Sequence, residues 1–142
     1  MTMKKIIFVI CLALVAMAAK AEGWTQAATD AGVEYIVENK VLSNSRGEFV
    51  TPVKMVYATD ESRTKVTTEE ELAKTAAYAV ASIKFSGDWS EWCLKDIIFY
   101  DADGTALKTT VVPGHEVEWE AVKPGSIYES IRNTAKALYN AQ

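Results

Sequence analysis

The sequence predicts an α+β domain: an antiparallel β-sheet of about five to six strands with a C-terminal α-helix packed on one face. Several short segments alternate apolar and polar residues, which is typical of strands with one buried face. Turn-forming stretches such as Asn44–Gly47 and Asp101–Gly104 separate these segments. The last segment instead spaces its apolar residues along one helix face. These residues are Ile127, Ile131, Ala135 and Leu138.

Residues 1–21 have the features of a secretory signal peptide. Lys4 and Lys5 precede an uncharged apolar run, and the small residues Ala19 and Ala21 stand where signal peptidase cleaves. The run is shorter than the ~20 residues that span a bilayer, so we expect cleavage after Ala21 rather than a membrane anchor. The predicted organisation is a signal peptide over 1–21 and a single domain over 22–142. The domain is expected in the periplasm, at the cell surface or secreted.

The mature domain is acidic. Removing residues 1–21 removes three lysines and no acidic residue, which takes the net charge from −4 to −7. Without a cluster of Lys and Arg, this charge argues against nucleic acid and against anionic lipid as partners. A protein partner is expected instead.

Cys93 is expected to be unpaired in the mature chain, because Cys11 leaves with the signal peptide. Exported proteins meet an oxidising compartment, where cysteines tend to pair. Cys93 is therefore either a small buried apolar residue or a thiol that bridges two copies in a homodimer. We favour burial, because Trp92 and Leu94 flank it in a predicted strand.

Extended segments are expected over residues 23–28, 33–38, 49–59, 78–85 and 92–100. Residues 105–109 are expected to form a return strand, and 117–122 a further short extended piece. Pro52 cannot donate a ladder hydrogen bond, so the segment 49–59 is expected at a sheet edge or with a bulge at Pro52.

The segment Trp92–Tyr100 is the longest unambiguous strand in the sequence, because the longer segment 49–59 contains Pro52. Strict alternation gives it two faces, one with Trp92, Leu94, Asp96, Ile98 and Tyr100 and the other with Cys93, Lys95, Ile97 and Phe99. Both faces are largely apolar, which favours an interior strand covered in part on both sides.

Two helices are predicted. A short one near residues 68–76 has Thr68 as its N-cap and Glu71 three residues later, after a polar turn over Asp60–Lys65. In the C-terminal helix Ser126 is the N-cap and Glu129 completes a capping box.

No catalytic, cofactor-binding or metal-binding residue is predicted, and we expect no enzymatic activity. His115 is the single histidine, and zinc sites usually need several His or Cys ligands. Ser126 is its nearest serine downstream, but helix capping already accounts for that residue. Asp101–Gly104 resembles the first half of a calcium loop, yet Val112 stands where the closing glutamate belongs. A turn is the favoured interpretation.

The tryptophans are candidates for a partner surface, since Trp and Tyr are enriched at interface hot spots. We expect Trp24, Trp92 and Trp119 in the core or at the seam between sheet and helix. Trp89 lies in a polar connection and is the best candidate for exposure.

Beyond Trp24, the chain carries Val33–Val37 and Val53–Tyr57, and then Trp92-Cys93 leading into Ile97–Gly104. It closes with Trp119–Ser126 and a helix that contains Glu129. In this order the features resemble the surface-adhesin protein E-like family of bacterial exported proteins, over nearly the whole mature chain.

The resemblance implies an antiparallel sheet with a C-terminal helix and a non-enzymatic role. The member that gives the family its name is an outer-surface adhesin for host extracellular-matrix and plasma proteins. Members typically pair the strand cysteine with one at the end of the terminal helix, but this helix ends Leu138–Gln142 without a cysteine. The lipid anchor of the named adhesin is also missing, because Val9 and Ile10 precede Cys11.

The first hypothesis is therefore an exported protein-binding module, acting as a surface adhesin for host matrix or plasma proteins. The second is a periplasmic housekeeping or inhibitory domain that binds another bacterial protein. The third, a small hydrolase that uses His115, ranks far below both.

Overall fold

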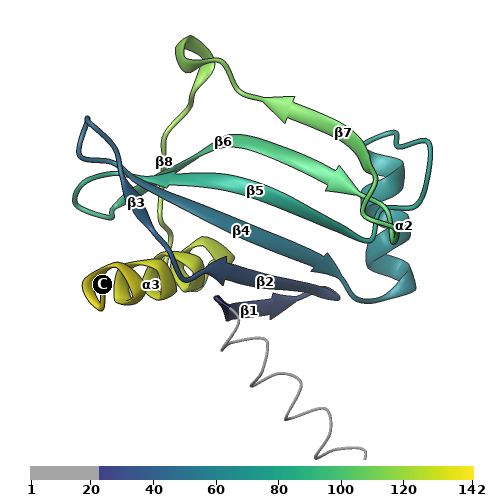
Figure 1. The fold of residues 1–142 in the computed structure, drawn as a ribbon, viewed down its shortest axis with the longest axis horizontal. Coiled ribbons are helices and arrows are strands. Elements are labelled where there is room, and N and C mark those ends of the chain that lie inside the picture. Colours follow the sequence, from purple (N-terminus) through teal and green to yellow (C-terminus); the bar gives the residue numbers. More distant parts are fainter. Residues whose placement is uncertain (1–22) are drawn as a thin grey trace, which may run out of the picture.

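The computed structural model describes residues 23–142, and the predicted signal peptide lies outside the described residues. The strands are β1 (Trp24–Asp30), β2 (Val33–Glu38), β3 (Leu42–Ser43), β4 (Phe49–Tyr57), β5 (Tyr78–Phe85), β6 (Glu91–Tyr100), β7 (Ala106–Val111) and β8 (Glu120–Ala121). The helices are α2 (Asp60–Glu69), α3 (Ile127–Asn140) and the 3₁₀-helix η1 (Gly114–Glu116). The predicted fold class is confirmed (Figure 1).

The strands form one curled antiparallel sheet in the order β1-β2-β4-β5-β6-β7. The short strands β3 and β8 pair with β4 and β6. Alternate residues of β5 are buried, namely Ala79, Ala81, Ile83 and Phe85. We call the side of the sheet that bears them the inner face. In Figure 1, α3 lies near one end of the long strands and α2 near the other.

Pro52 is in neither of the predicted settings. Strand β4 lies inside the sheet, between β5 on one side and β2 and β3 on the other, and its pairing with β5 runs through Pro52 without a bulge. Pairing with β2 ends at Val53, and pairing with β3 begins at Val50. Pro52 therefore falls where one neighbouring strand gives way to another, and its missing N–H interrupts neither ladder.

Strand β6 contains a bulge that the prediction of strict alternation missed. Ser82 pairs with Asp96 while Ile83 pairs with Leu94, so Lys95 is an extra residue. A bulge of one residue moves every later side chain to the opposite face of the sheet. The side chains of β6 therefore divide between the two faces as follows. Trp92, Leu94, Ile97 and Phe99 lie on the inner face, and Cys93, Asp96, Ile98 and Tyr100 lie on the outer face.

Helix α3 has the predicted N-cap and apolar stripe, but not the predicted capping box. Ser126 is the N-cap, and its hydroxyl accepts a hydrogen bond from the Glu129 N–H at 3.2 Å. The carboxylate of Glu129 accepts from the Gly125 N–H, one residue before the expected partner. Ile131 and Ala135 are fully buried against β1 and β2, which confirms the apolar stripe.

Helix α2 was predicted too late in the chain. It covers Asp60–Glu69, with Thr59 rather than Thr68 as its N-cap. Thr59 and Ser62 form a reciprocal capping box, and Ser62 is also tied to the β1–β2 turn. By local sequence Thr68 is an equally good N-cap, but the helix ends one residue after it. The hydrogen bond from Ser62 to the β1–β2 turn favours the start at Thr59.

Trp89, predicted as exposed, is buried. It is 7% exposed, and its ring stacks on Phe49 with centroids 4.0 Å apart. The backbone N–H of Trp89 donates to the Ser86 carbonyl. Trp89 itself has a positive φ of 65°, and in this turn its indole ring lies in the core. Beside it, hydrogen bonds from Ser90 and then Ser86 lower the pKa of Asp88 to about 2.

The remaining tryptophans divide between the two faces of the sheet. Trp92 stacks on Tyr128 of α3 at 3.5 Å, so its predicted place at the sheet–helix seam is confirmed. Trp119 is half-buried beside Lys84, whose ammonium lies 5.7 Å from its ring. Lys84 is on the outer face, so Trp119 is not at that seam. Trp24 is half-buried in β1.

A candidate functional site between the two helices

Two adjoining cavities lie on the inner face, between α2 and α3. The first, of about 280 Å³, is lined by Asp30, Ala31, Val33, Tyr35, Met55, Tyr57, Ser62, Lys65, Val66 and Glu69. The second, of about 270 Å³, is lined by Met55, Tyr57, Val66, Glu70, Ile83, Trp92, Leu94, Ile97, Phe99 and Tyr128. They share Met55, Tyr57 and Val66. We call the two together the inner cleft.

The floor of the inner cleft is apolar because of the β6 bulge. Leu94 precedes the bulge and Ile97 follows it, and both face the second cavity. With strict alternation Asp96 would face inward in place of Ile97. One inserted residue, Lys95, therefore decides that an apolar side chain rather than a carboxylate lies beneath the cleft.

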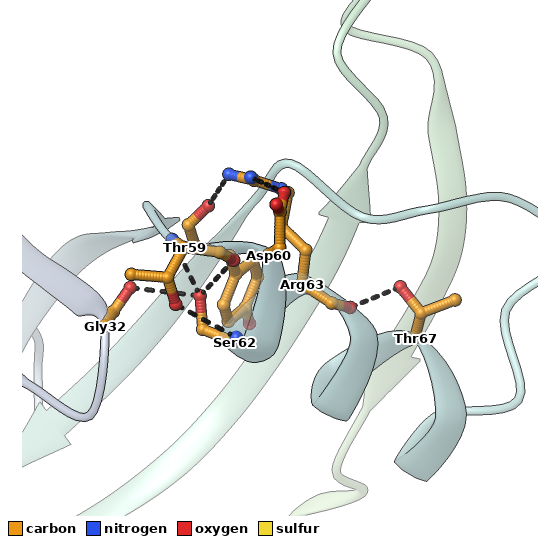
Figure 2. A network of polar contacts seen from close by, with 7 residues as sticks. Gly32, Thr59, Asp60, Ser62, Arg63 and Thr67 are labelled. Atoms are coloured by element: carbon orange, nitrogen blue, oxygen red, sulfur yellow. Dashed lines mark hydrogen bonds and ion pairs between the residues drawn. The ribbon is translucent and has the colours of Figure 1, made fainter.

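Helix α2 forms one wall, and polar contacts hold it in place (Figure 2). The Ser62 hydroxyl lies 3.0 Å from the Gly32 carbonyl and 2.9 Å from the Thr59 carbonyl. Arg63 donates to the Tyr57 carbonyl at 2.9 Å and pairs with Asp60. These contacts fix the start of α2 to β4 and to the β1–β2 turn.

The end of α2 is held in the same way. The Thr67 hydroxyl donates to the Arg63 carbonyl at 2.6 Å and accepts from the Ala76 N–H at 3.0 Å. Ser62 is the buried residue of this helix, which therefore covers little of the sheet. The inner cleft is the space that this polar helix leaves open.

Three tyrosines line the cleft, and burial raises the pKa of each. Asp30 raises the pKa of Tyr35 further. For Tyr57 the additional causes are Tyr35 and Glu70, and for Tyr128 they are Tyr35 and Glu120. The three phenols stay protonated near neutral pH, so each offers one hydrogen-bond donor and an aromatic face.

Acidic residues stand at the rim. Asp30 and Glu69 are exposed at the first cavity, together with the single ammonium group of Lys65. At the second cavity, Glu70 pairs with Lys108 at 3.1 Å. The rim of the first cavity therefore has one more carboxylate than ammonium.

His115 and Ser126, the two residues considered for a hydrolase, each have other contacts. The side chain of His115 is 81% exposed in η1, and its nearest charged partner is Glu116 at 3.7 Å. The Ser126 hydroxyl donates to the Lys123 carbonyl at 2.6 Å and accepts from the Glu129 N–H, so helix capping occupies it. Nothing joins His115 and Ser126 in one site.

Asp101–Gly104 forms a turn, as predicted. The buried Asp101 carboxylate accepts from the Asp103 and Thr105 N–H groups, each at 2.9 Å, and Gly104 has a φ of 82°. This carboxylate is committed to its own turn. Across residues 23–142, no group of three or more His, Cys, Asp or Glu side chains is placed to hold a metal ion.

Cys93 is 1% exposed, which confirms burial over an accessible thiol. The pKa of the thiol is raised, mainly by burial. Lys84 acts in the opposite direction, and Glu48 adds to the increase. The side chain lies on the outer face, away from α3. Cys93 is therefore not placed for the disulfide to the terminal helix that the family resemblance implies.

Sequence reasoning missed the inner cleft itself. Alternation within the segments 33–38 and 49–59 puts Tyr35 and Tyr57 on the apolar faces of their strands, which is the one available indication. Their meeting with Tyr128 depends on the strand order and on where α2 begins, and neither can be deduced from local patterns.

Comparison with protein-family models finds none that matches the chain. Comparison with curated proteins finds no similar sequence. Within the described residues, no helix is both long and apolar enough to cross a membrane.

Proposed function

We propose that the chain is an exported, non-enzymatic protein-binding module, and that the inner cleft is its binding site. The observation that carries this proposal is the lining of the cleft. An apolar floor around Leu94 and Ile97 meets the phenols of Tyr35, Tyr57 and Tyr128. Tyrosine is among the residue types enriched at the hot spots that supply most of the binding energy of protein interfaces. The apolar floor adds surface that leaves water when a partner binds.

The partner class comes from the resemblance to the surface-adhesin protein E-like family, which favours a host extracellular-matrix or plasma protein. The alternative is another bacterial envelope protein, bound by a periplasmic housekeeping or inhibitory domain. Added protease distinguishes the two, because an adhesin is cleaved on intact cells and a periplasmic domain is cleaved only after lysis.

Val66→Glu tests the binding site. Val66 lies on α2 and faces both cavities, so the variant places a carboxylate in the cleft. Thr64→Glu is the matched control, because it adds the same charge to an exposed position of the same helix. Circular dichroism melting first establishes that both variants are folded.

Binding is then measured by surface plasmon resonance on laminin, fibronectin and fibrinogen, and by cross-linking to bacterial envelope proteins. We expect Val66→Glu to lose the partner that wild type and Thr64→Glu retain, because the longer side chain obstructs the apolar second cavity and its charge is costly to bury there. If folded wild-type protein captures nothing from either set, or Val66→Glu binds as wild type does, the proposal is wrong.

A further inference from the structure

We propose that the inner cleft recognises a polypeptide segment with a basic side chain close to an apolar one, the basic group at the first cavity and the apolar group in the second. This inference rests on the proposed function and specifies the chemistry of its partner. It depends on how differently the two halves of the cleft are lined.

The second cavity suits an apolar side chain. Its floor and walls include Ile83, Leu94, Ile97 and Phe99, all from the inner faces of β5 and β6. Its one charged lining residue, Glu70, is already paired with Lys108. An apolar group that binds here is removed from water, which is favourable, and the Glu70–Lys108 ion pair stays intact.

The first cavity suits a cation. Asp30 and Glu69 face a single opposing ammonium, that of Lys65, which leaves an excess of negative charge. The aromatic ring of Tyr35 lines the same cavity, and the face of a tyrosine ring attracts ammonium and guanidinium groups. Asp30 lines this cavity as well, so a carboxylate and an aromatic side chain border the same space.

The inner cleft has two compartments with different linings, of about 280 and about 270 Å³. They adjoin through Met55, Tyr57 and Val66, so neighbouring side chains of one segment reach both. The overall negative charge of the mature domain also draws basic segments toward it.

The test uses three fluorescein-labelled peptides of equal length and equal leucine content. Their polar positions carry lysine, serine or glutamate. Fluorescence anisotropy measures their affinity for the full mature protein. We expect the lysine peptide to bind about tenfold more tightly than the serine peptide, since a few partly exposed ion pairs together supply that factor. The glutamate peptide is expected to bind most weakly.

A charge-matched pair of variants separates the cleft from general attraction. Asp30→Asn with Glu69→Gln removes both carboxylates of the first cavity and leaves the ammonium of Lys65. Glu91→Gln with Glu116→Gln removes the same charge from exposed positions that line neither cavity. We expect the first pair to weaken binding of the lysine peptide about fivefold and the second less than twofold. Melting curves verify folding of both near-isosteric pairs.

The outcomes that oppose the inference are distinct from those that oppose the proposed function. Equal loss in the two double variants, or equal affinity for the lysine and serine peptides, overturns the basic–apolar specificity. If Val66→Glu still abolishes binding of the peptides or of the protein partner, the cleft remains the binding site and the proposed function stands. If Val66→Glu changes neither peptide nor protein binding, the proposed function itself fails.

Discussion

The two ends of the inner face are covered by helices of opposite character. At one end, α3 buries Ile131 and Ala135 completely beneath a cluster that contains Phe85 and Trp89. At the other end, α2 is almost entirely polar, and its buried residue is Ser62. The first helix is held by apolar burial, and the second by hydrogen bonds to Gly32, Thr59 and other backbone groups (Figure 2).

This difference explains where the candidate site lies. A helix with a continuous apolar stripe fills the sheet beneath it, because its side chains interdigitate with those of the strands. A polar helix fixed at its ends by hydrogen bonds has nothing with which to fill that space. The inner cleft therefore opens beside α2, where Val66 reaches the sheet.

The largest effect is expected from Ile131→Ala at the α3 end. Ile131 is fully buried, so truncation removes apolar contacts and leaves a cavity. We expect a loss of about 2–5 kcal/mol in the free energy of unfolding, measured by urea denaturation. Lys136→Ala, at an exposed position of the same helix, is the control and should change stability by less than about 0.5 kcal/mol. Similar small losses in both variants would show that burial does not hold α3.

A smaller effect, of a different kind at each end, is expected from removing the helix caps. Thr59→Ala and Ser126→Ala each delete a hydroxyl that accepts an N–H at the start of a helix, at a cost of about 1 kcal/mol. Because α2 depends on polar contacts, Thr59→Ala should also speed amide hydrogen exchange within α2 under native conditions. Ser126→Ala should leave α2 exchange unchanged. Mass spectrometry of the α2 peptide distinguishes the two, and equal exchange in both variants would contradict the proposed difference.

The smallest effect at neutral pH is expected from Tyr57→Phe in the cleft. The pKa of Tyr57 is raised in the folded protein, first by burial and then by Tyr35 and Glu70. Unfolded tyrosine ionises near pH 10, so the stability from keeping this phenol neutral is fully present below about pH 10. It is lost as the pH rises further, because the unfolded chain then releases the proton more readily.

Tyr57→Phe removes that contribution. Its free energy of unfolding should match wild type within about 0.5 kcal/mol at pH 8. Between pH 8 and pH 11 it should decline less steeply than that of wild type, as measured by urea denaturation at each pH. Parallel decline in the two proteins would mean that Tyr57 does not titrate differently on unfolding.

Much of the fold could be predicted because its determinants are local. The strands over 33–38 and 78–85 begin and end where alternation and turn residues place them. The stripe of α3 and its Ser126 cap depend on residues within one or two turns of each other. The turn at Asp101 is closed by its own carboxylate. Such patterns need no partner elsewhere in the chain.

The candidate site was not predictable in the same way. Thr59 and Thr68 are both acceptable N-caps by local pattern, and only the contact of Ser62 with the distant Gly32 carbonyl selects the first. Trp89 stands among polar neighbours, and only its packing against the distant Phe49 places the ring in the core. In both cases the deciding contact joins segments far apart in the sequence.

By itself, the sequence determined the class of fold, the principal strands and the capped apolar helix, because periodicity and turn chemistry are properties of neighbouring residues. Tertiary structure alone decided the β6 bulge, the start of α2 and the cleft between the helices. The physical reason is register. Whether Ile97 or Asp96 lies beneath the cleft depends on how β6 pairs with β5, and one extra residue at Lys95 reverses every face that follows.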